Sequence, residues 1–288
     1  MKTNIRLLFT ACAAALVTGC TNLDVDVESQ YTEYPTNEIA VEAKMADVYY
    51  QMRDVFGRRY MEAQALSSDE YTAVSYGGGW YDSGAYAHPS LHNYTYEDAT
   101  IDWMGQLTSG ITKANKIIIE LGGNEAGATV APARAMRAFF HFILMDCWGD
   151  APILDHAMAE GETIDRSPRA DVARFIESEL KEIIPQLTDE VNANTYGKPT
   201  KWMAEALLAK IYINWPVYTA ASVDLYDAAT AKNEKLNDCI ALCDDIIKSG
   251  KFNLGSMSYS KKFGPDNGSH VEDFIYVMPY DTYTAQGM

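Results

Sequence analysis

Residues 131–152 read APARAMRAFFHFILMDCWGDAP, and this stretch gives the clearest indication of the fold. Its large apolar side chains recur at helical spacing, at Met136, Phe139, Phe140, Ile143, Leu144 and Cys147. Side chains three and four positions apart lie on one face of an α-helix, so one stripe of this helix is expected to be buried. The stretch predicts a core helix that leaves through Gly149-Asp150-Ala151-Pro152.

The same period marks five further helices on either side of this one. They are expected at Met45–Phe56, Met104–Leu121, Ser167–Leu187, Thr200–Trp215 and Leu236–Ile247. Ser167-Pro168 predicts a helix start, because serine is a good N-cap and proline suits the first helical position. In the last helix the stripe expected to be buried consists of Leu236, Ile240, Cys243 and Ile247. Strand signal is confined to short pieces such as Phe274–Met278.

Successive helical hairpins of this kind predict a mostly α fold with a tetratricopeptide-like scaffold, although the strict 34-residue repeat signature is not visible. Two stretches lack the helical period, namely Gly57–Glu97 and the tail after Lys251. Long irregular segments within a compact domain are usually functional loops.

Charge and cysteine content argue against several classes of protein. The chain has 288 residues, with 23 Lys and Arg against 40 Asp and Glu, which gives a formal net charge of −17. A surface of that sign repels phosphate backbones, so nucleic acid is not an expected partner. Beyond the N-terminal segment, Cys147, Cys239 and Cys243 form neither a disulfide framework nor a paired zinc motif, and we expect them to be buried thiols.

The N-terminus carries the features of a secretion signal. Lys2 and Arg6 precede an apolar stretch, Leu7–Val17, that is too short to span a bilayer. The segment ends in Val17-Thr18-Gly19-Cys20, which resembles a bacterial lipobox, where the cysteine is acylated and becomes the first residue of the mature chain. Acyl chains on Cys20 would hold the protein to a membrane. The alternative is an ordinary cleaved signal with a chance cysteine.

The mature chain is expected to begin with a solvated acidic tether. Asp24 and its acidic neighbours show no hydrophobic period, and an acidic stretch at this place resembles the signal that exports lipoproteins to the outer face of the outer membrane. We expect a lipoprotein signal peptide at 1–19, the tether at 20–35 and one α-helical domain at 36–288. No later segment approaches 18 unbroken apolar residues, so we expect the chain to be anchored to the membrane and not to cross it.

The irregular stretch before residue 103 is rich in aromatic residues. Eight of the 33 residues from Tyr71 to Trp103 are aromatic, against 11% of the whole chain: Tyr71, Tyr76, Trp80, Tyr81, Tyr86, Tyr94, Tyr96 and Trp103. Short polar side chains alternate with them. This mixture suits a sugar ring, whose C–H face packs on an aromatic ring while its hydroxyls need hydrogen-bond partners at the rim. We expect at least Trp80 to face a ligand; the other interpretation is a loop that only packs on itself.

Enzyme and metal-site motifs are weak in this sequence. Asp69, Glu70 and Asp82 could supply two carboxylates for glycoside hydrolysis, but that chemistry needs a defined separation that a sequence does not give. The chain has no Gly-x-Ser-x-Gly elbow and no His-Glu-x-x-His motif. His88 and His92 have no obvious third ligand, so hydrogen bonding or ligand contact is expected of them. We predict no catalysis, no metal and no cofactor.

Several short segments occur in a fixed order along the chain. They are the lipobox with Asp24, Leu66-Ser67-Ser68-Asp69-Glu70, Trp103 leading to Ile111–Ile117, the helix 133–152 with its Arg-Ala-aromatic centre and Gly-Asp-x-Pro exit, Arg166-Ser167-Pro168, Gly197–Lys201 before Ala206–Ala209, and Ser249-Gly250-Lys251-Phe252. Together these segments resemble the SusD/RagB family of outer-membrane nutrient-binding lipoproteins, the SusD-like proteins of starch-utilisation-system type.

The resemblance implies a tetratricopeptide-like helical scaffold, no enzymatic activity and a place as the surface lid on a TonB-dependent transporter of the SusC type. In that family the scaffold helices face the transporter, and the loops bind the nutrient, commonly a glycan and sometimes a peptide. Family members are considerably longer than this chain. The resemblance therefore also implies that a C-terminal part is lacking and that a site built from Trp80 and its neighbours is incomplete.

Residues and resemblance lead to one prediction of function. The protein is expected to be a cell-surface, lipid-anchored outer-membrane protein that binds an oligo- or polysaccharide and delivers it to a SusC-like TonB-dependent transporter. The predicted ligand contacts are Trp80 and Tyr81 as stacking faces, with Tyr76, Asp69, Glu70, Asp82 and His88 around them. Two alternatives stay open: a peptide-binding member of the same family, and a helical-repeat adaptor whose aromatic loop packs inward.

Overall fold

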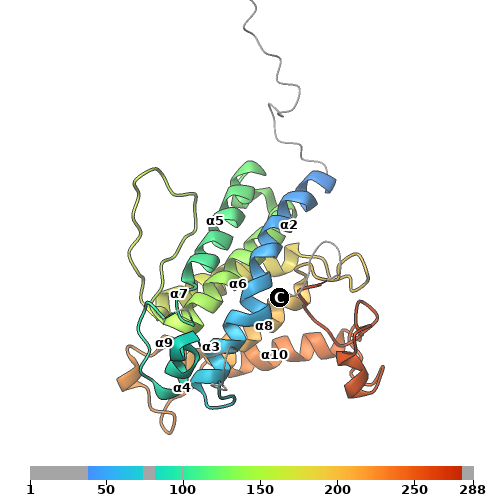
Figure 1. Ribbon diagram of the computed structural model, residues 1–288. Helices are drawn as coiled ribbons and strands as arrows, with labels where there is room; N and C mark the ends of the chain where they lie inside the picture. The colour runs from blue at the N-terminus through green and yellow to red at the C-terminus, as the bar shows by residue number, and fades with distance from the viewer. Residues whose placement is uncertain (1–37, 74–81, 99, 281–288) are drawn as a thin grey trace, which may run out of the picture. The chain divides into compact units, whose positions relative to one another are not determined.

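The structure is a computed structural model that describes residues 38–73, 82–98 and 100–280 (Figure 1). The chain divides into two units, residues 1–36 and residues 37–288, and every described residue belongs to the second unit. The predicted signal peptide, Cys20 and the acidic tether lie outside the described residues.

The described residues form a mostly α fold, as predicted. The α-helices are α2 (Glu38–Asp54), α3 (Tyr60–Ser67), α4 (His88–Leu91), α5 (Met104–Glu120), α6 (Ala131–Trp148), α7 (Arg169–Ile183), α8 (Lys201–Ile213), α9 (Trp215–Thr219) and α10 (Leu236–Lys248). A π-helical turn, η1 (Val55–Arg59), joins α2 to α3. The 3-10 helices are η2 (Asp82–Ala87), η3 (Asn124–Thr129), η4 (Ile184–Gln186), η5 (Val223–Leu225) and η6 (Tyr259–Phe263). None of these helices is long and apolar enough to cross a membrane.

Two regions depart from the predicted secondary structure. The stretch from Gly57 was expected to be irregular, but helix continues through η1 and α3 to Ser67, and η2 and α4 form after residue 81. The short strand predicted at Phe274–Met278 is wrong: within residues 38–280, where described, the one β contact is the isolated bridge between Ala151 and Ser167. The tail after Lys251 is irregular apart from η6, as predicted.

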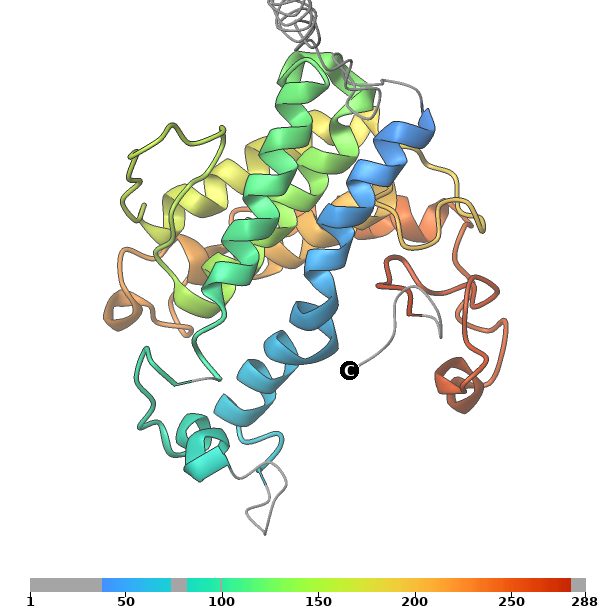
Figure 2. The ribbon, with the colours of Figure 1, turned by 45° about the horizontal axis from the view of Figure 1, so that its top comes forward.

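The core forms around α6, which packs between α5 and α7, while α2 packs on α5 and α10 on α8 (Figures 1 and 2). The helix is buried almost all round from Ala131 to Met145, as a central helix must be. Four of the six residues predicted to form its apolar stripe are fully buried, namely Met136, Phe140, Ile143 and Leu144. The sequence pattern that predicts a core helix therefore lies on the most enclosed element described.

Gly110 lets α5 lie directly against the Phe140 ring of α6. A Cβ atom at Gly110 would lie 2.5 Å from Cζ of the buried Phe140 ring, whereas a Cβ at Gly105, one and a half turns earlier, would meet nothing within 4 Å. We expect Gly110→Ala to lower the free energy of unfolding by about 1–3 kcal/mol, because the ring has no space to retreat into. The matched Gly105→Ala change is expected to be neutral or to stabilise by about 0.5–1 kcal/mol. Urea unfolding of both variants tests this, and equal effects would contradict it.

Capping groups set the starts of α7 and α8. Thr200 caps α8 through its side chain, which accepts a hydrogen bond from the Met203 N–H at 3.3 Å. Ser167 was predicted to cap α7, but it instead exchanges two backbone hydrogen bonds with Ala151, and Pro168 takes the N-cap position. The Asp150 carboxylate accepts the hydrogen bond from the Arg169 N–H at 2.9 Å, so an acidic side chain from the turn after α6 satisfies one donor at the start of α7.

The predicted orientation of α10 is wrong. The stripe expected to be buried, Leu236, Ile240, Cys243 and Ile247, is exposed, and Ile247 keeps 75% of its surface accessible. Cys239 faces α8 instead and donates a hydrogen bond from its thiol to the Ala209 carbonyl at 3.3 Å. The described cysteines are free thiols, but only Cys239 is buried, so the expectation of three buried thiols holds for one of them.

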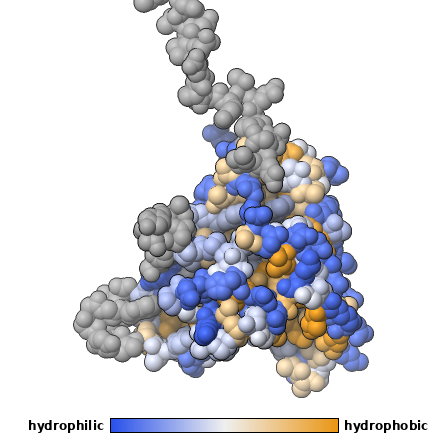
Figure 3. Space-filling view, turned by 90° about the vertical axis from the view of Figure 1, so that its right-hand side faces the viewer, coloured by the Kyte–Doolittle hydropathy of each residue, from blue (hydrophilic) through white to orange (hydrophobic). Residues whose placement is uncertain are grey.

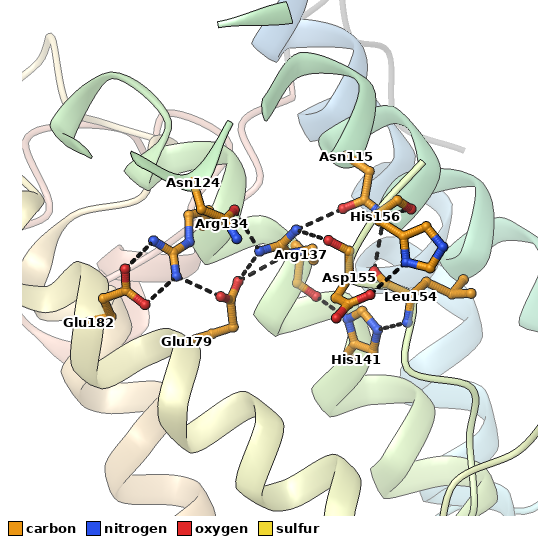
Figure 4. A network of polar contacts seen from close by, with 10 residues as sticks. All are labelled: Asn115, Asn124, Arg134, Arg137, His141, Leu154, Asp155, His156, Glu179 and Glu182. Carbon is orange, nitrogen blue, oxygen red and sulfur yellow. Dashed lines mark hydrogen bonds and ion pairs between the residues drawn. The ribbon is translucent and has the colours of Figure 1, made fainter. Parts of the chain in front are cut away.

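A buried polar network joins α5, α6 and α7 to the 149–168 loop (Figure 4). Glu179 accepts hydrogen bonds from Arg134 at 2.7 Å and from Arg137 Nε at 3.0 Å, and both guanidinium groups are almost fully buried. Arg137 also donates to Asn115 Oδ1 and to the Asp155 carbonyl, each at 2.9 Å. The network fixes this loop on the helical frame.

Candidate functional site

The segment between α3 and α5 carries the predicted site, and the structure describes part of it. Tyr76, Trp80 and Tyr81 lie outside the described residues, and only the backbone of Asp82 is described. Asp69 and Glu70 lie in the turn that ends α3, and both are exposed. Their role as ligand contacts stays a prediction.

The described part of this segment is fastened to α3. The Ser90 hydroxyl donates a hydrogen bond to the Leu66 carbonyl at 2.9 Å. The Arg58 guanidinium bonds to the Tyr86 hydroxyl and lies over the same ring. Pro89 in α4 is buried. The segment is therefore held on a rigid helix, as a binding loop requires.

His88 is engaged within the segment. Its Nδ1 lies 2.7 Å from Asp98 Oδ1, and the Thr95 backbone N–H donates to the same carboxylate. These two interactions, the Thr95 bond first, lower the pKa of Asp98. They close residues 88–98 into a compact loop. Because Nδ1 of His88 is engaged by Asp98, a ligand contact from this ring would use Nε2.

Packing divides the aromatic residues of the segment into two groups. Tyr86 and Trp103 are buried, and Trp103 keeps only 2% of its surface accessible. Trp103 meets the ring of Trp148 edge-on, with the ring centroids 4.6 Å apart. Tyr71, Tyr94 and Tyr96 are exposed, and Tyr96 keeps 82% of its surface accessible. The exposed tyrosines present flat faces to solvent, and the buried rings hold the segment in place.

A cleft runs along the last turn of α6, and of the three exposed tyrosines Tyr94 lines it; we call it the α6 cleft. One cavity of about 260 Å³ is lined by residues of α3, of the aromatic segment and of α6, among them Gln64, Tyr94 and Trp148. An adjoining cavity of about 520 Å³ shares Gln64 and Trp148 and extends to Arg169 and Asn214. Aromatic faces, amides and a guanidinium thus line one continuous concave surface.

Asp146 organises the floor of the α6 cleft. Its carboxylate accepts hydrogen bonds from the Tyr60 and Tyr218 hydroxyls, each at 2.7 Å, and from the Gln64 amide at 3.3 Å. Burial, and next the nearby Asp146 charge, raise the pKa of both tyrosines. Both hydroxyls therefore stay protonated as donors, and the carboxylate fixes the side chains that line the cleft.

The arrangement suits binding more than covalent chemistry. Burial raises the pKa of the Cys147 thiol in the cleft to about 12, so the nucleophilic thiolate is not formed at neutral pH. Among the residues that the structure describes, no group of three or more His, Cys, Asp and Glu side chains is placed to hold a metal ion.

The fold is a helical scaffold with a cleft beside its aromatic segment, and comparison with known proteins gives its family. Residues 23–213 match the SusD-like family model described as starch-binding associating with outer membrane. This match covers more than half of the chain, so the chain belongs to the SusD-like family, and the resemblance seen in the sequence is confirmed.

Individual relatives are distant in sequence but share the fold. A SusD-like protein from Bacteroides ovatus is 24% identical over 230 residues, which cover 72% of this chain and 39% of that protein. Surface glycan-binding protein A from Bacteroides thetaiotaomicron, in complex with laminarihexaose, aligns with a TM-score of 0.65 at 16% identity, over 87% of this chain and 53% of that one. A SusD superfamily protein from Bacteroides fragilis gives a TM-score of 0.67 at 16% identity, over 88% and 51%. The chain thus spans 39–53% of the length of these relatives.

Proposed function

We propose that the protein binds a glycan, an oligo- or polysaccharide, on the surface formed by the aromatic segment and the α6 cleft. The observation that carries this proposal is that the exposed Tyr94 of the aromatic segment lines a cleft together with Gln64, and that the adjoining cavity adds Asn214 and Arg169. A sugar ring needs both kinds of contact at once, an aromatic face for its C–H groups and hydrogen-bonding groups for its hydroxyls. The family description and the glycan-binding relative support the same class of ligand.

The predicted contacts belong to this proposal. Trp80 and Tyr81 would add stacking faces, with Tyr76, Asp69, Glu70, Asp82 and His88 around them. The loop on which they lie is held at both of its described ends, by α3 and by the buried Trp103.

The place of the protein in the cell is part of the proposal. Cys20 would carry acyl chains that hold the chain at the outer face of the outer membrane. The bound glycan would then pass to a SusC-like TonB-dependent transporter held beside it. Modest affinity suffices for such a transfer, because binding raises the local concentration of glycan at the transporter.

Native affinity electrophoresis through gels that contain plant, microbial or host polysaccharides tests the proposal. The full chain with Cys20→Ser, which cannot be acylated there, is compared with the same chain carrying Trp80→Ala or Tyr96→Ala. We expect one polysaccharide to retard the parent chain, Trp80→Ala to abolish the retardation, and Tyr96→Ala to weaken binding about 2- to 13-fold, the loss of about 0.5–1.5 kcal/mol of stacking.

The control is Tyr259→Ala, which removes an equally exposed tyrosine from η6, outside the aromatic segment. Neither exposed tyrosine should change stability by more than about 0.5 kcal/mol, so altered mobility can be assigned to binding. Retardation that is the same in all variants would contradict this site, and binding of peptides without any polysaccharide would contradict the ligand class.

A further inference from the structure

A second cavity, larger than those of the α6 cleft, lies between the loop 191–200 and the tail 250–277; we call it the tail cleft. Its volume is about 650 Å³, within the range of roughly 300–1,000 Å³ that is typical of small-ligand sites. Figure 3 faces the side of the molecule where this loop and this tail lie, and hydrophobic and hydrophilic residues are interleaved there. The cavity lies outside the aromatic segment, and residues of two of the family-like sequence segments, Gly197–Lys201 and Ser249–Phe252, help to line it.

Both walls of the tail cleft are fixed by hydrogen bonds. The loop wall is attached to α8, because the Trp202 indole N–H donates to the Asp189 carbonyl at 2.8 Å. In the tail wall, Asn253 bonds to Glu272 twice, through its backbone N–H and through its side-chain amide, each at 3.1 Å. Phe252 packs edge-on against Trp202, which ties the two walls together at their base. Such a cleft is preformed, so a ligand need not order it on binding.

The two walls meet at Gly197. This glycine has a φ of +78°, and a Cβ atom there would lie 2.8 Å from the ring of Pro279 in the tail. The absence of a side chain therefore lets the tail lie directly on the loop and closes one end of the cleft.

Polar side chains line the cleft without a partner. Tyr196, Lys251 and His270 all line it, and none of their side chains makes a hydrogen bond or an ion pair with any residue of the described ranges. Lys198, one residue outside the cleft lining, is by contrast paired with Glu42. A phenol, an ammonium group and an imidazole thus face one space with their hydrogen-bonding capacity unused by the protein.

The composition of the tail cleft selects the ligand chemistry. The Lys251 charge is balanced by the Glu272 carboxylate in the same lining, so the cleft does not favour a strongly anionic ligand. An apolar ligand would bury the free polar groups without partners, which costs about 1–3 kcal/mol for each group. A neutral ligand with many hydroxyls would satisfy them, and its C–H faces could pack on Tyr196 and on Phe274 of the opposite wall.

We infer that the tail cleft is a second saccharide site, which takes a short neutral oligosaccharide through Tyr196, Lys251 and His270. It is separate from the aromatic segment, because the two sites share no lining residue. The inference extends the proposed function to a second site on the same chain. One polysaccharide held at two points dissociates far more slowly than from either site alone.

Amide NMR of the full ¹⁵N-labelled, deuterated Cys20→Ser chain tests the inference, because it reports each site by its own residues. The probes are neutral gluco-, manno- and xylo-oligosaccharides, acidic oligosaccharides and a mixture of short peptides. We expect at least one neutral oligosaccharide to give saturable shifts at Gly197, Gly250 and Ser269. The double change Tyr196→Ala with His270→Ala should weaken that binding at least tenfold, and Tyr96→Ala should leave it unchanged.

His270→Ala alone serves as a second variant, since this exposed side chain can be removed without affecting the fold. Shifts at these three amides without shifts in residues 82–103 would support the tail cleft while overturning the proposed glycan surface. Saccharide shifts confined to residues 82–103, shifts at the tail cleft only with peptides or acidic sugars, or no saccharide shift at all would overturn this inference.

Discussion

Glu179→Ala is expected to lower the free energy of unfolding by about 3–5 kcal/mol. The substitution leaves the Arg137 guanidinium, which is 99% inaccessible to solvent, without a carboxylate partner in the described structure. Truncating one member of a buried ion pair is costly because the surviving charge is neither solvated nor paired. Arg137 also holds Asn115 and the Asp155 carbonyl, so the loss is expected to loosen the 149–168 loop as well.

Glu182→Ala is the matched control for this prediction. Glu182 lies on the same helix and also pairs with Arg134, but its side chain keeps 56% of its surface accessible. Solvent screens such a pair, so we expect a loss of about 0–1 kcal/mol. Chemical denaturation of both variants gives the comparison. Losses of similar size would show that burial does not set the strength of this network.

The second large effect concerns pH and His141. This ring is fully buried in α6, accepts a hydrogen bond from the Leu154 N–H at Nε2 and donates one from Nδ1 to the Arg137 carbonyl. Burial, the largest cause, lowers the pKa of His141 to about 4 from its ordinary value of 6.5. The unfolded chain therefore binds a proton between about pH 6.5 and pH 4 that the folded protein does not bind. Stability falls as the pH falls through this window, by about 2 kcal/mol from pH 7 to pH 5.

His141→Gln removes this titration, so the difference in stability between the parent and the variant should shrink by about 2 kcal/mol as the pH falls from 7 to 5. Hydrogen bonds from His156 to Asp155 and Glu162 raise the pKa of His156, so this group adds stability that is complete below about pH 6.5 and is lost as the pH rises through its raised pKa. That group is present in both proteins, so its effect cancels in the difference. Parallel stability curves for the two proteins would contradict the assignment.

The predictability of the fold from sequence follows from how many sides of each helix are covered. The centre of α6 was predictable because α5 and α7 cover it, so its apolar residues are buried apart from the half-buried Phe139. The apolar residues of α10 occupy more of the helix circumference than one neighbouring helix can cover. The sequence period therefore does not predict which of them pack against α8. The prediction that Ser167 caps α7 was wrong because the Ser167 backbone pairs with Ala151. The Asp150 carboxylate instead accepts the hydrogen bond from the Arg169 N–H at the start of α7.

The aromatic segment of the candidate site could be recognised from the sequence, its role in binding stays a proposal, and the contacts around it could not be predicted. The density of aromatic residues marked the stretch up to Trp103. Whether one of these rings is buried depends on a partner far away in the sequence, and for Trp103 that partner is Trp148. Gln64 and Asp146 were missed because they lie 82 positions apart and meet only in the fold. The one local sign was the carboxylate of Asp146 directly after the apolar run Phe142–Met145, since an acidic residue is rarely buried without a partner.

The π-helical turn η1 joins α2 to α3 (Figure 2), and the number of residues in this turn sets which way the side chains of α3 point. Each residue of an α-helix turns the chain by about 100°. The wider π-helical turn at Val55–Arg59 accommodates one extra residue without interrupting the helix. Loss of a single residue there would let α2 and α3 continue as a regular helix and rotate every side chain of α3 by about that angle. Gln64 would then point away from Asp146, so the α6 cleft depends on the number of residues in this turn as well as on their identity.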